Sequence, residues 1–127
     1  MFSHVMLGTD NLDISKGFYD AVLDTLGAQP GVADEGNGRV FWMTPTGAFC
    51  VTKPINGQAA CHANGGTIGF ACASPEQVDA WHAAGVANGG KTCEDPPGER
   101  AGSGLYLAYL RDPAGNKLCA LHQMQAS

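Results

Sequence analysis

The sequence predicts an α+β fold in which two βαβββ modules form a curled mixed sheet, and the main support for it is an internal repeat. Residues 4–8 and the aromatic pair Phe18-Tyr19 are matched by residues 67–71 and the pair Trp81-His82 at one constant offset of 63 residues. Apolar residues alternate in both leading segments and recur at helical spacing after them. The 127 residues suit one domain, with module 1 at about 1–54, a linker at about 55–65 and module 2 at about 66–127.

The first module begins with an alternating strand at residues 4–8 and a helix that Asp10 or Asn11 can cap. An apolar residue at every fourth position gives the helix a stripe that can lie on a sheet, and Gly27 can end it in the left-handed conformation. The stripe consists of Ile14, Phe18, Val22 and Leu26. The polar segment 31–38 is expected to hold a short strand and a turn. Strands at 40–44 and 49–53 follow, joined by a hairpin turn at Pro45-Thr46-Gly47.

The second module repeats this order. Its leading strand at 67–73 precedes a strong helix start, with Ser74 as the N-cap, Pro75 in the first turn and Gln77 at the reciprocal capping position. The helix is expected to end at Gly89-Gly90. A loop at 94–104 leads to strands at 105–110 and 117–122, and Asp112 and Asn116 are interpreted as formers of the turn between them.

Composition and charge exclude several classes of function. The net charge is −5 and the 7 Lys and Arg residues are scattered, so no basic stripe is available to bind nucleic acid. No apolar run approaches the ~20 residues that span a membrane, and no signal peptide is evident, so we expect a cytoplasmic protein without a membrane partner. The 5 cysteines form no CxxC pair, which indicates reduced thiols and no structural zinc site.

Several segments occur in an order and at a spacing that are informative together. They are His4, residues 18–20, residues 66–70 and the ending 109–118, which contains the pattern DP-x-GN. In these segments the chain resembles the vicinal oxygen chelate superfamily, which includes glyoxalase I, bleomycin-resistance proteins, fosfomycin-resistance enzymes and extradiol dioxygenases. The resemblance covers nearly the whole chain. It implies the fold of that superfamily, with an open hollow between the modules, and it also implies a homodimer.

Metal-dependent members of that superfamily hold a divalent ion in the hollow with His or Glu from the first and last strands of the modules. At the matching positions this chain has His4, Thr67 and Cys119, and aligning the two turns 45–47 and 113–115 places Val51 at the fourth. The set lacks the carboxylate that Mg²⁺ or Mn²⁺ prefers, and catalytic zinc usually takes three protein ligands. We therefore expect no metal cofactor, with His4 as the only residue at a matching ligand position.

Five residues are candidate contacts for a small-molecule ligand: His4, Trp42, Thr67, Tyr106 and Cys119. His4 can be a hydrogen-bonding pocket residue, a remaining metal ligand or a structural strand residue. Cys119 can be a catalytic nucleophile if His4 lies beside it and lowers its pKa, or a small buried apolar residue. Trp42, Tyr106 and Tyr109 lie on strands that would wall the hollow, and the strand register decides which of them face inward.

Two functions follow from these observations. The first is binding of a small molecule in the hollow without a metal, in the manner of a glyoxalase/bleomycin-resistance-like protein. The second is catalysis by a glyoxalase-like lyase or isomerase that has an atypical metal site or uses His4 with Cys119.

Overall fold

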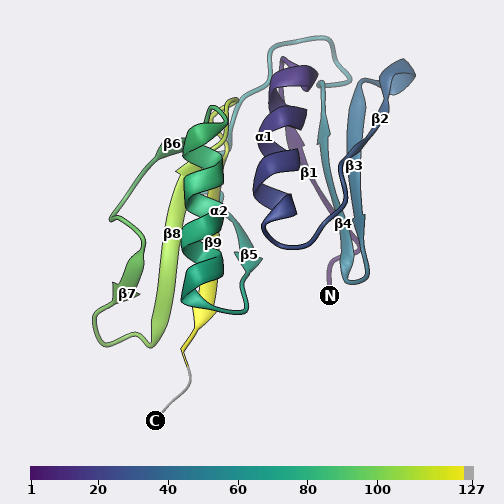
Figure 1. Cartoon of the computed structure of the whole chain (residues 1–127). Coiled ribbons are helices and arrows are strands. Elements are labelled where there is room, and N and C mark those ends of the chain that lie inside the picture. The colour runs from purple at the N-terminus through teal and green to yellow at the C-terminus, as the bar shows by residue number, and fades with distance from the viewer. Residues whose placement is uncertain (125–127) are drawn as a thin grey trace.

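The structure, a computed structural model that describes residues 1–124, consists of two mixed sheets that are each backed by one α-helix (Figure 1). It confirms the predicted α+β fold. The first module comprises β1 (His4–Gly8), α1 (Leu12–Asp24), β2 (Val32–Asp34), the 3₁₀ turn η1 (Glu35–Asn37), β3 (Arg39–Thr44) and β4 (Gly47–Thr52). The second comprises β5 (Ile68–Ala71), α2 (Pro75–Ala87), β6 (Lys91–Thr92), β7 (Gly98–Arg100), β8 (Leu105–Arg111) and β9 (Lys117–Gln123). Residues 125–127 of the predicted second module lie outside the described residues.

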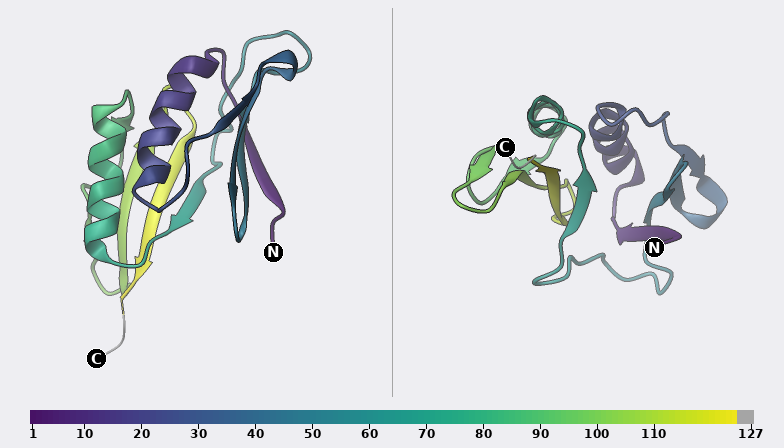
Figure 2. Two further views of the ribbon diagram at one scale, coloured as in Figure 1. Left: turned by 45° about the vertical axis from the view of Figure 1, so that its right-hand side comes forward. Right: turned by 90° about the horizontal axis from the view of Figure 1, so that it is seen from below.

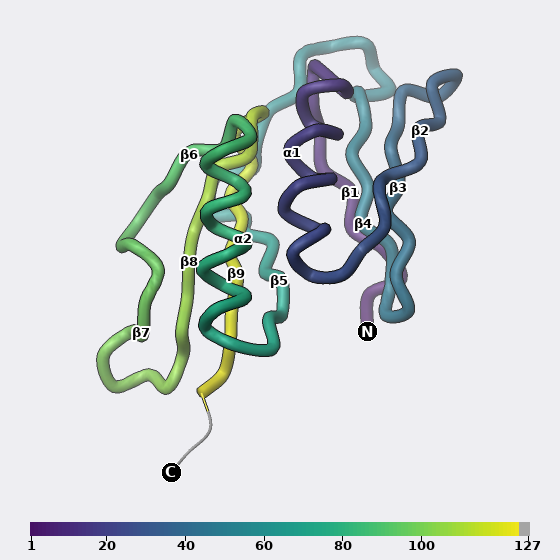
Figure 3. The backbone as a smooth tube through the Cα atoms, viewed as in Figure 1, coloured from purple at the N-terminus to yellow at the C-terminus, as the bar shows by residue number. Residues whose placement is uncertain are grey.

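The leading strand of each module pairs in parallel with the last strand of the same module. The strand order is therefore β1-β4-β3-β2 in one sheet and β5-β9-β8-β6 in the other, with β7 also paired to β8. Both helices lie on the same side of the sheets, and the segment that links the modules crosses on the opposite side (Figure 2). The chain trace shows β1 and β5 as the inner strands of the two modules (Figure 3).

Helix α1 begins as predicted but buries a different stripe. The Asn11 side chain accepts a hydrogen bond from the Ile14 amide at 3.1 Å, which confirms the N-cap. Ile14 itself is 53% exposed, so its predicted place in the buried stripe is wrong. A four-residue spacing drifts by about 40° per step around a helix, and the buried face follows the mixed three- and four-residue spacing instead. Its members are Ser15, Phe18, Tyr19, Val22 and Leu23.

The cap of α2 connects the two helices. Ser74 accepts a hydrogen bond from the Gln77 amide at 3.1 Å, as predicted. The Gln77 carboxamide accepts from the Ala73 amide at 2.6 Å, one residue earlier than a capping box requires, and donates to the Thr25 carbonyl at 3.0 Å. This side chain therefore fixes the start of α2 against the end of α1.

The predicted loop at 94–104 contains a strand. β6 covers only one end of the outer edge of β8, and β7 pairs with the other end. The Arg100 guanidinium donates to the carbonyls of Asp95, Pro96 and Gly98, which holds the loop against this edge. The sequence shows no alternation here, because a three-residue edge strand is too short to have a pattern.

Three buried polar side chains, those of Tyr19, Asp112 and Asn116, join the two modules. Tyr19 of α1 donates its hydroxyl to the Asp112 carboxylate at 2.5 Å, and the Asn116 carboxamide donates to the Gly8 carbonyl at 3.0 Å. Burial, the charge of Asp112 and this hydrogen bond raise the pKa of Tyr19 well above its ordinary value, so the phenol remains a donor. Asp112 and Asn116 form the β8–β9 turn, as predicted, and they also join it to the first module. We call these contacts the inter-module lock.

Asp20 joins α1 to the β2–β3 hairpin. The surroundings of its carboxylate predict a contribution to stability that is lost in acid. Its carboxylate accepts hydrogen bonds from the Gly31 amide at 2.7 Å, the Trp42 indole at 2.9 Å and the Lys16 ammonium at 2.6 Å. Burial acts to raise the pKa of Asp20, but these hydrogen bonds and the charge of Lys16 together lower it. The unfolded chain therefore binds a proton more readily than the folded chain.

A lowered pKa in the folded state means that this stabilisation is complete above about pH 4 and is lost as the pH falls through the folded pKa. We expect the unfolding free energy of Asp20→Asn to fall less between neutral and acidic pH than that of wild type. Urea denaturation at a series of pH values measures the difference. Asp24→Asn, at an exposed position in the same helix, is the control. A slope that is unchanged in Asp20→Asn would contradict this account.

Candidate functional site

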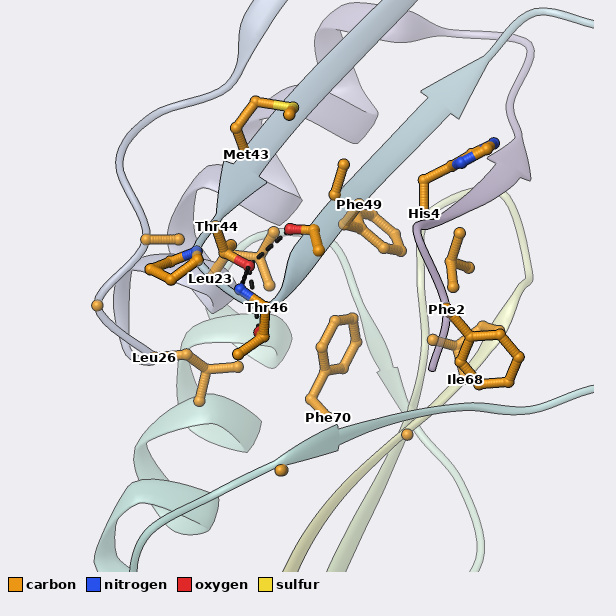
Figure 4. A pocket seen from close by; sticks show the side chains of 18 of the residues that line it. Phe2, His4, Leu23, Leu26, Met43, Thr44, Thr46, Phe49, Ile68 and Phe70 are labelled. Atoms are coloured by element: carbon orange, nitrogen blue, oxygen red, sulfur yellow. Dashed lines mark hydrogen bonds between the residues drawn. The ribbon is translucent and has the colours of Figure 1, made fainter.

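A cleft of about 650 Å³ lies between the modules, at the end where β1 begins and β5 ends. Its walls are mainly apolar and include Leu23, Leu26, Phe49, Ile68 and Phe70. The phenyl rings of Phe49 and Phe70 lie opposite one another across the module boundary, with centroids 5.6 Å apart (Figure 4). The cleft therefore has an apolar floor to which both modules contribute.

The β3–β4 hairpin and the first residues of the chain form one rim of the cleft. The hairpin loop has two residues, and the Thr44 hydroxyl closes it by donating to the Gly47 carbonyl at 2.6 Å. Gly47 has φ +152°, and a side chain there would lie 3.3 Å from the carbonyl oxygens of Phe2 and Ser3. Glycine thus lets the N-terminal segment run beside the hairpin, where the Ala48 amide donates to the Ser3 carbonyl at 3.0 Å.

His4 lies at the rim of this cleft, on the face of β1 opposite Val5 and Leu7, which pack on the core. It is exposed, and its Nδ1 is 2.8 Å from the Ser3 hydroxyl. Figure 4 shows its imidazole directed away from the rings of Phe49 and Phe70. The structure therefore places His4 beside the cleft, and its part in binding stays a prediction.

Two of the predicted aromatic contacts lie on the helix side of their strands. Trp42 is 1% exposed and donates its indole N–H to Asp20, while Tyr106 donates its hydroxyl to Asp79 of α2 at 2.9 Å. Neither Trp42 nor Tyr106 is among the described residues that line the cleft, so their predicted contacts with a ligand gain no support from it. Tyr109 lies on the opposite face of β8 from Tyr106, where it pairs directly with Cys119, and it is not among the described residues that line the cleft either.

Neither Thr67 nor Cys119 is among the described residues that line the cleft beside His4. Thr67 is exposed and directly precedes β5. Cys119 is 6% exposed on β9, and burial raises the pKa of its thiol. Its Sγ lies 3.5 Å from the Ala120 carbonyl, and no hydrogen bond between described residues joins it to His4. The thiol stays protonated at neutral pH, which does not favour a nucleophile.

The cysteines differ in their surroundings. All five lie within the described part of the chain and are free. Cys50, Cys72 and Cys119 are buried, whereas Cys61 in the inter-module linker is exposed.

Strand register also corrects one position in the metal-ligand set. β1 pairs Met6 with Cys50, and β5 pairs Gly69 with Cys119. Since Met6 follows His4 by the same number of residues as Gly69 follows Thr67, the residue equivalent to Cys119 is Cys50. Val51 points into the core instead. The turn alignment failed because β3–β4 has a two-residue loop, whereas five residues, 112–116, connect β8 to β9.

The corrected set of His4, Cys50, Thr67 and Cys119 does not fit the metal sites of the enzymes that the sequence resembles. It offers no carboxylate oxygen for a hard cation. Burial raises the pKa of both thiols, which opposes the deprotonation that a thiolate ligand needs. Within residues 1–124, no group of three or more His, Cys, Asp or Glu side chains is placed to hold a metal ion.

No helix in this range is long and apolar enough to cross a membrane.

Comparison with known proteins agrees with the fold described above. Residues 1–120 match the family model described as the Glyoxalase/Bleomycin resistance protein/Dioxygenase superfamily. A crystal structure of a glyoxalase/bleomycin resistance protein from Albidiferax ferrireducens T118 is 64% identical, with a TM-score of 0.91 over 96% of this chain and 98% of that one.

More distant structures share the fold alone. A family enzyme from Burkholderia phytofirmans PsJN has 17% identity and a TM-score of 0.73, covering 96% of this chain and 98% of its own. A lactoylglutathione lyase from Agrobacterium tumefaciens has 21% identity and a TM-score of 0.68, covering 96% of this chain and 92% of its own. No curated protein matches the sequence.

Proposed function

Because the chain belongs to the glyoxalase/bleomycin resistance protein/dioxygenase superfamily, we propose that it binds a small molecule in the cleft between its two modules. The observation that carries this proposal is the cleft itself. Its volume of about 650 Å³ lies in the range of pockets that hold drug-sized ligands, and its lining is mainly apolar. The ring floor made by Phe49 and Phe70 offers a surface to a hydrophobic or aromatic compound.

The proposed binding uses no divalent metal. The positions that correspond to metal ligands hold two buried thiols, one exposed threonine and one exposed imidazole. A glyoxalase-like lyase or isomerase reaction is the alternative that the sequence left open. Its version with a His4/Cys119 mechanism is disfavoured by the raised pKa of Cys119 and by the separate hydrogen-bond partners of the two residues. A homodimer and a cytoplasmic location stay predictions.

Ligand-induced stabilisation tests the proposal. We expect a subset of apolar and aromatic compounds to raise the unfolding temperature, because a ligand that binds only the folded chain adds about 2.7 kcal/mol at 100 times its Kd. His4→Ala should weaken binding only slightly, since the imidazole lies at the rim and points away from the floor. A broad compound library without any stabilising member would contradict the proposal.

The metal content of the same preparation is the control. After dialysis against Mn²⁺, Ni²⁺, Zn²⁺ and Fe²⁺ and desalting, we expect elemental analysis to find far less than one ion per chain. Near-stoichiometric metal that is lost in His4→Ala would favour the lyase or isomerase alternative instead.

A further inference from the structure

The internal repeat relates the two ends of the module boundary, and within the described residues only one end has a buried side-chain lock. At the end of β1, the β8–β9 turn supplies Asp112 and Asn116 to the inter-module lock. The repeat makes the β3–β4 hairpin the counterpart of this turn, and His82 the counterpart of Tyr19. The end of β5 should therefore meet a second lock.

Within residues 1–124 the second lock is absent for a structural reason. The β3–β4 hairpin passes directly from Thr44 to Gly47 through two residues, so it has no counterpart of the five-residue segment that contains Asp112 and Asn116. His82 bonds to Thr92 of its own module, with Nε2 3.0 Å from the hydroxyl oxygen. The cleft lies at this end, where the Gln77 carboxamide donates a hydrogen bond to the Thr25 carbonyl but no buried counterpart of Asp112 is present among the described residues.

The chemistry of the lining restricts what can fill the cleft. Among the described residues that line it there is no Asp, Glu, Lys or Arg side chain, and His4 is the one titratable side chain. The Thr44 hydroxyl is already engaged by the Gly47 carbonyl. Apart from the terminal amino group of Met1, a fully exposed residue, the cleft therefore offers an ionised ligand group no charged partner in exchange for its lost water, whereas an aromatic ring would meet the rings of Phe49 and Phe70.

On the basis of the proposed function, we propose that the ligand is an uncharged aromatic compound that occupies the place of the missing second lock. In the cleft the ligand contacts both modules. Asp112 and Tyr19 join the modules at the opposite end of the boundary. Leu26, which follows α1, extends into this space from one side, and Ile68 and Phe70 of β5 border it from the other (Figure 4).

Three probes that share one ring system test the charge requirement: 2-naphthol, 2-naphthoate and 2-naphthylmethylammonium, each titrated calorimetrically at pH 7. We expect wild type to bind 2-naphthol at least about tenfold more tightly than either ion, a difference of about 1.4 kcal/mol. A preference for either ion would overturn this inference and leave small-molecule binding standing. Failure of all three probes to bind would also overturn this inference, whereas the proposed function is decided by the compound library.

A charge placed inside the cleft tests the location. Leu26→Lys should lower the affinity for 2-naphthol and raise that for 2-naphthoate, because the new ammonium lies among the lining residues. Met43→Lys, at a rim position that is 71% exposed, is a second variant that leaves the core untouched and should shift the preference in the same direction. Ile14→Lys, on the exposed face of α1, is the control. Equal shifts in the Ile14 and Leu26 variants would overturn the location.

Discussion

Asp112→Ala is expected to lower the unfolding free energy by about 3–5 kcal/mol, a large part of the 5–15 kcal/mol that stabilises a typical domain. The Asp112 side chain is almost fully buried and accepts hydrogen bonds from Tyr19, from the amides of Ala114 and Asn116, and from the Asn116 carboxamide. Its removal leaves the buried Tyr19 hydroxyl without an acceptor and loosens the turn that joins the modules. Urea denaturation followed by circular dichroism measures the loss.

Tyr19→Phe separates the lock from the turn. The phenylalanine ring keeps the packing of Tyr19 against Phe18 and Phe49, and Asp112 keeps its other donors. We therefore expect a smaller loss of about 1–2 kcal/mol. A double-mutant cycle with Asp112→Ala should show clear coupling between the two residues.

A second tyrosine–aspartate pair provides a matched control. Tyr106 donates to Asp79 at 2.9 Å between β8 and α2, but this hydrogen bond is exposed to solvent. Asp79→Ala should reduce stability by less than about 1 kcal/mol, since water replaces the lost partner. Equal losses in Asp79→Ala and Asp112→Ala would show that burial at the module boundary does not strengthen the lock.

Most of the fold could be predicted from local sequence signals. The caps at Asn11 and Ser74 and both long hairpins depend on residues that are close in sequence, and the repeat supplied the module order. The buried stripe of α1 was misplaced at Ile14, because a strict four-residue period departs from the helical period. β7 was missed, because its pairing depends on the free edge of β8 and not on its own residues.

The candidate site was harder to predict, because it depends on register and on contacts between distant segments. A shift of one residue decides which face of β3 Trp42 occupies, and the sequence does not fix that choice. The partners Tyr19 and Asp112 are 93 residues apart, so Asp112 could only be interpreted as a turn former. The cleft is bounded by strand ends and by a hairpin. These segments are far apart in the sequence, so no periodic pattern indicates that they come together.

Gly85→Ala is expected to destabilise the protein by about 1–3 kcal/mol, although alanine is the better helix former by about 1 kcal/mol. Gly85 lies in α2 where the helix meets α1 and β8. A Cβ atom there would overlap the Cδ1 atom of Leu110, and it would lie 3.3 Å from Phe18 Cε2 and from Val22 Cγ1. These three neighbours are fully buried, so none can move away without disturbing the core. The crowding therefore exceeds the gain in helix propensity.

The same substitution in α1 should have the opposite sign. Gly17 is exposed, and a Cβ atom there meets nothing within 4 Å, so Gly17→Ala should gain up to about 1 kcal/mol from helix propensity alone. Thermal and urea denaturation of the two variants compares one chemical change in two environments. If Gly85→Ala were as stabilising as Gly17→Ala, the core would have to relax around α2. The contact between the helices would then be looser than the packing of Gly85 against Leu110 implies.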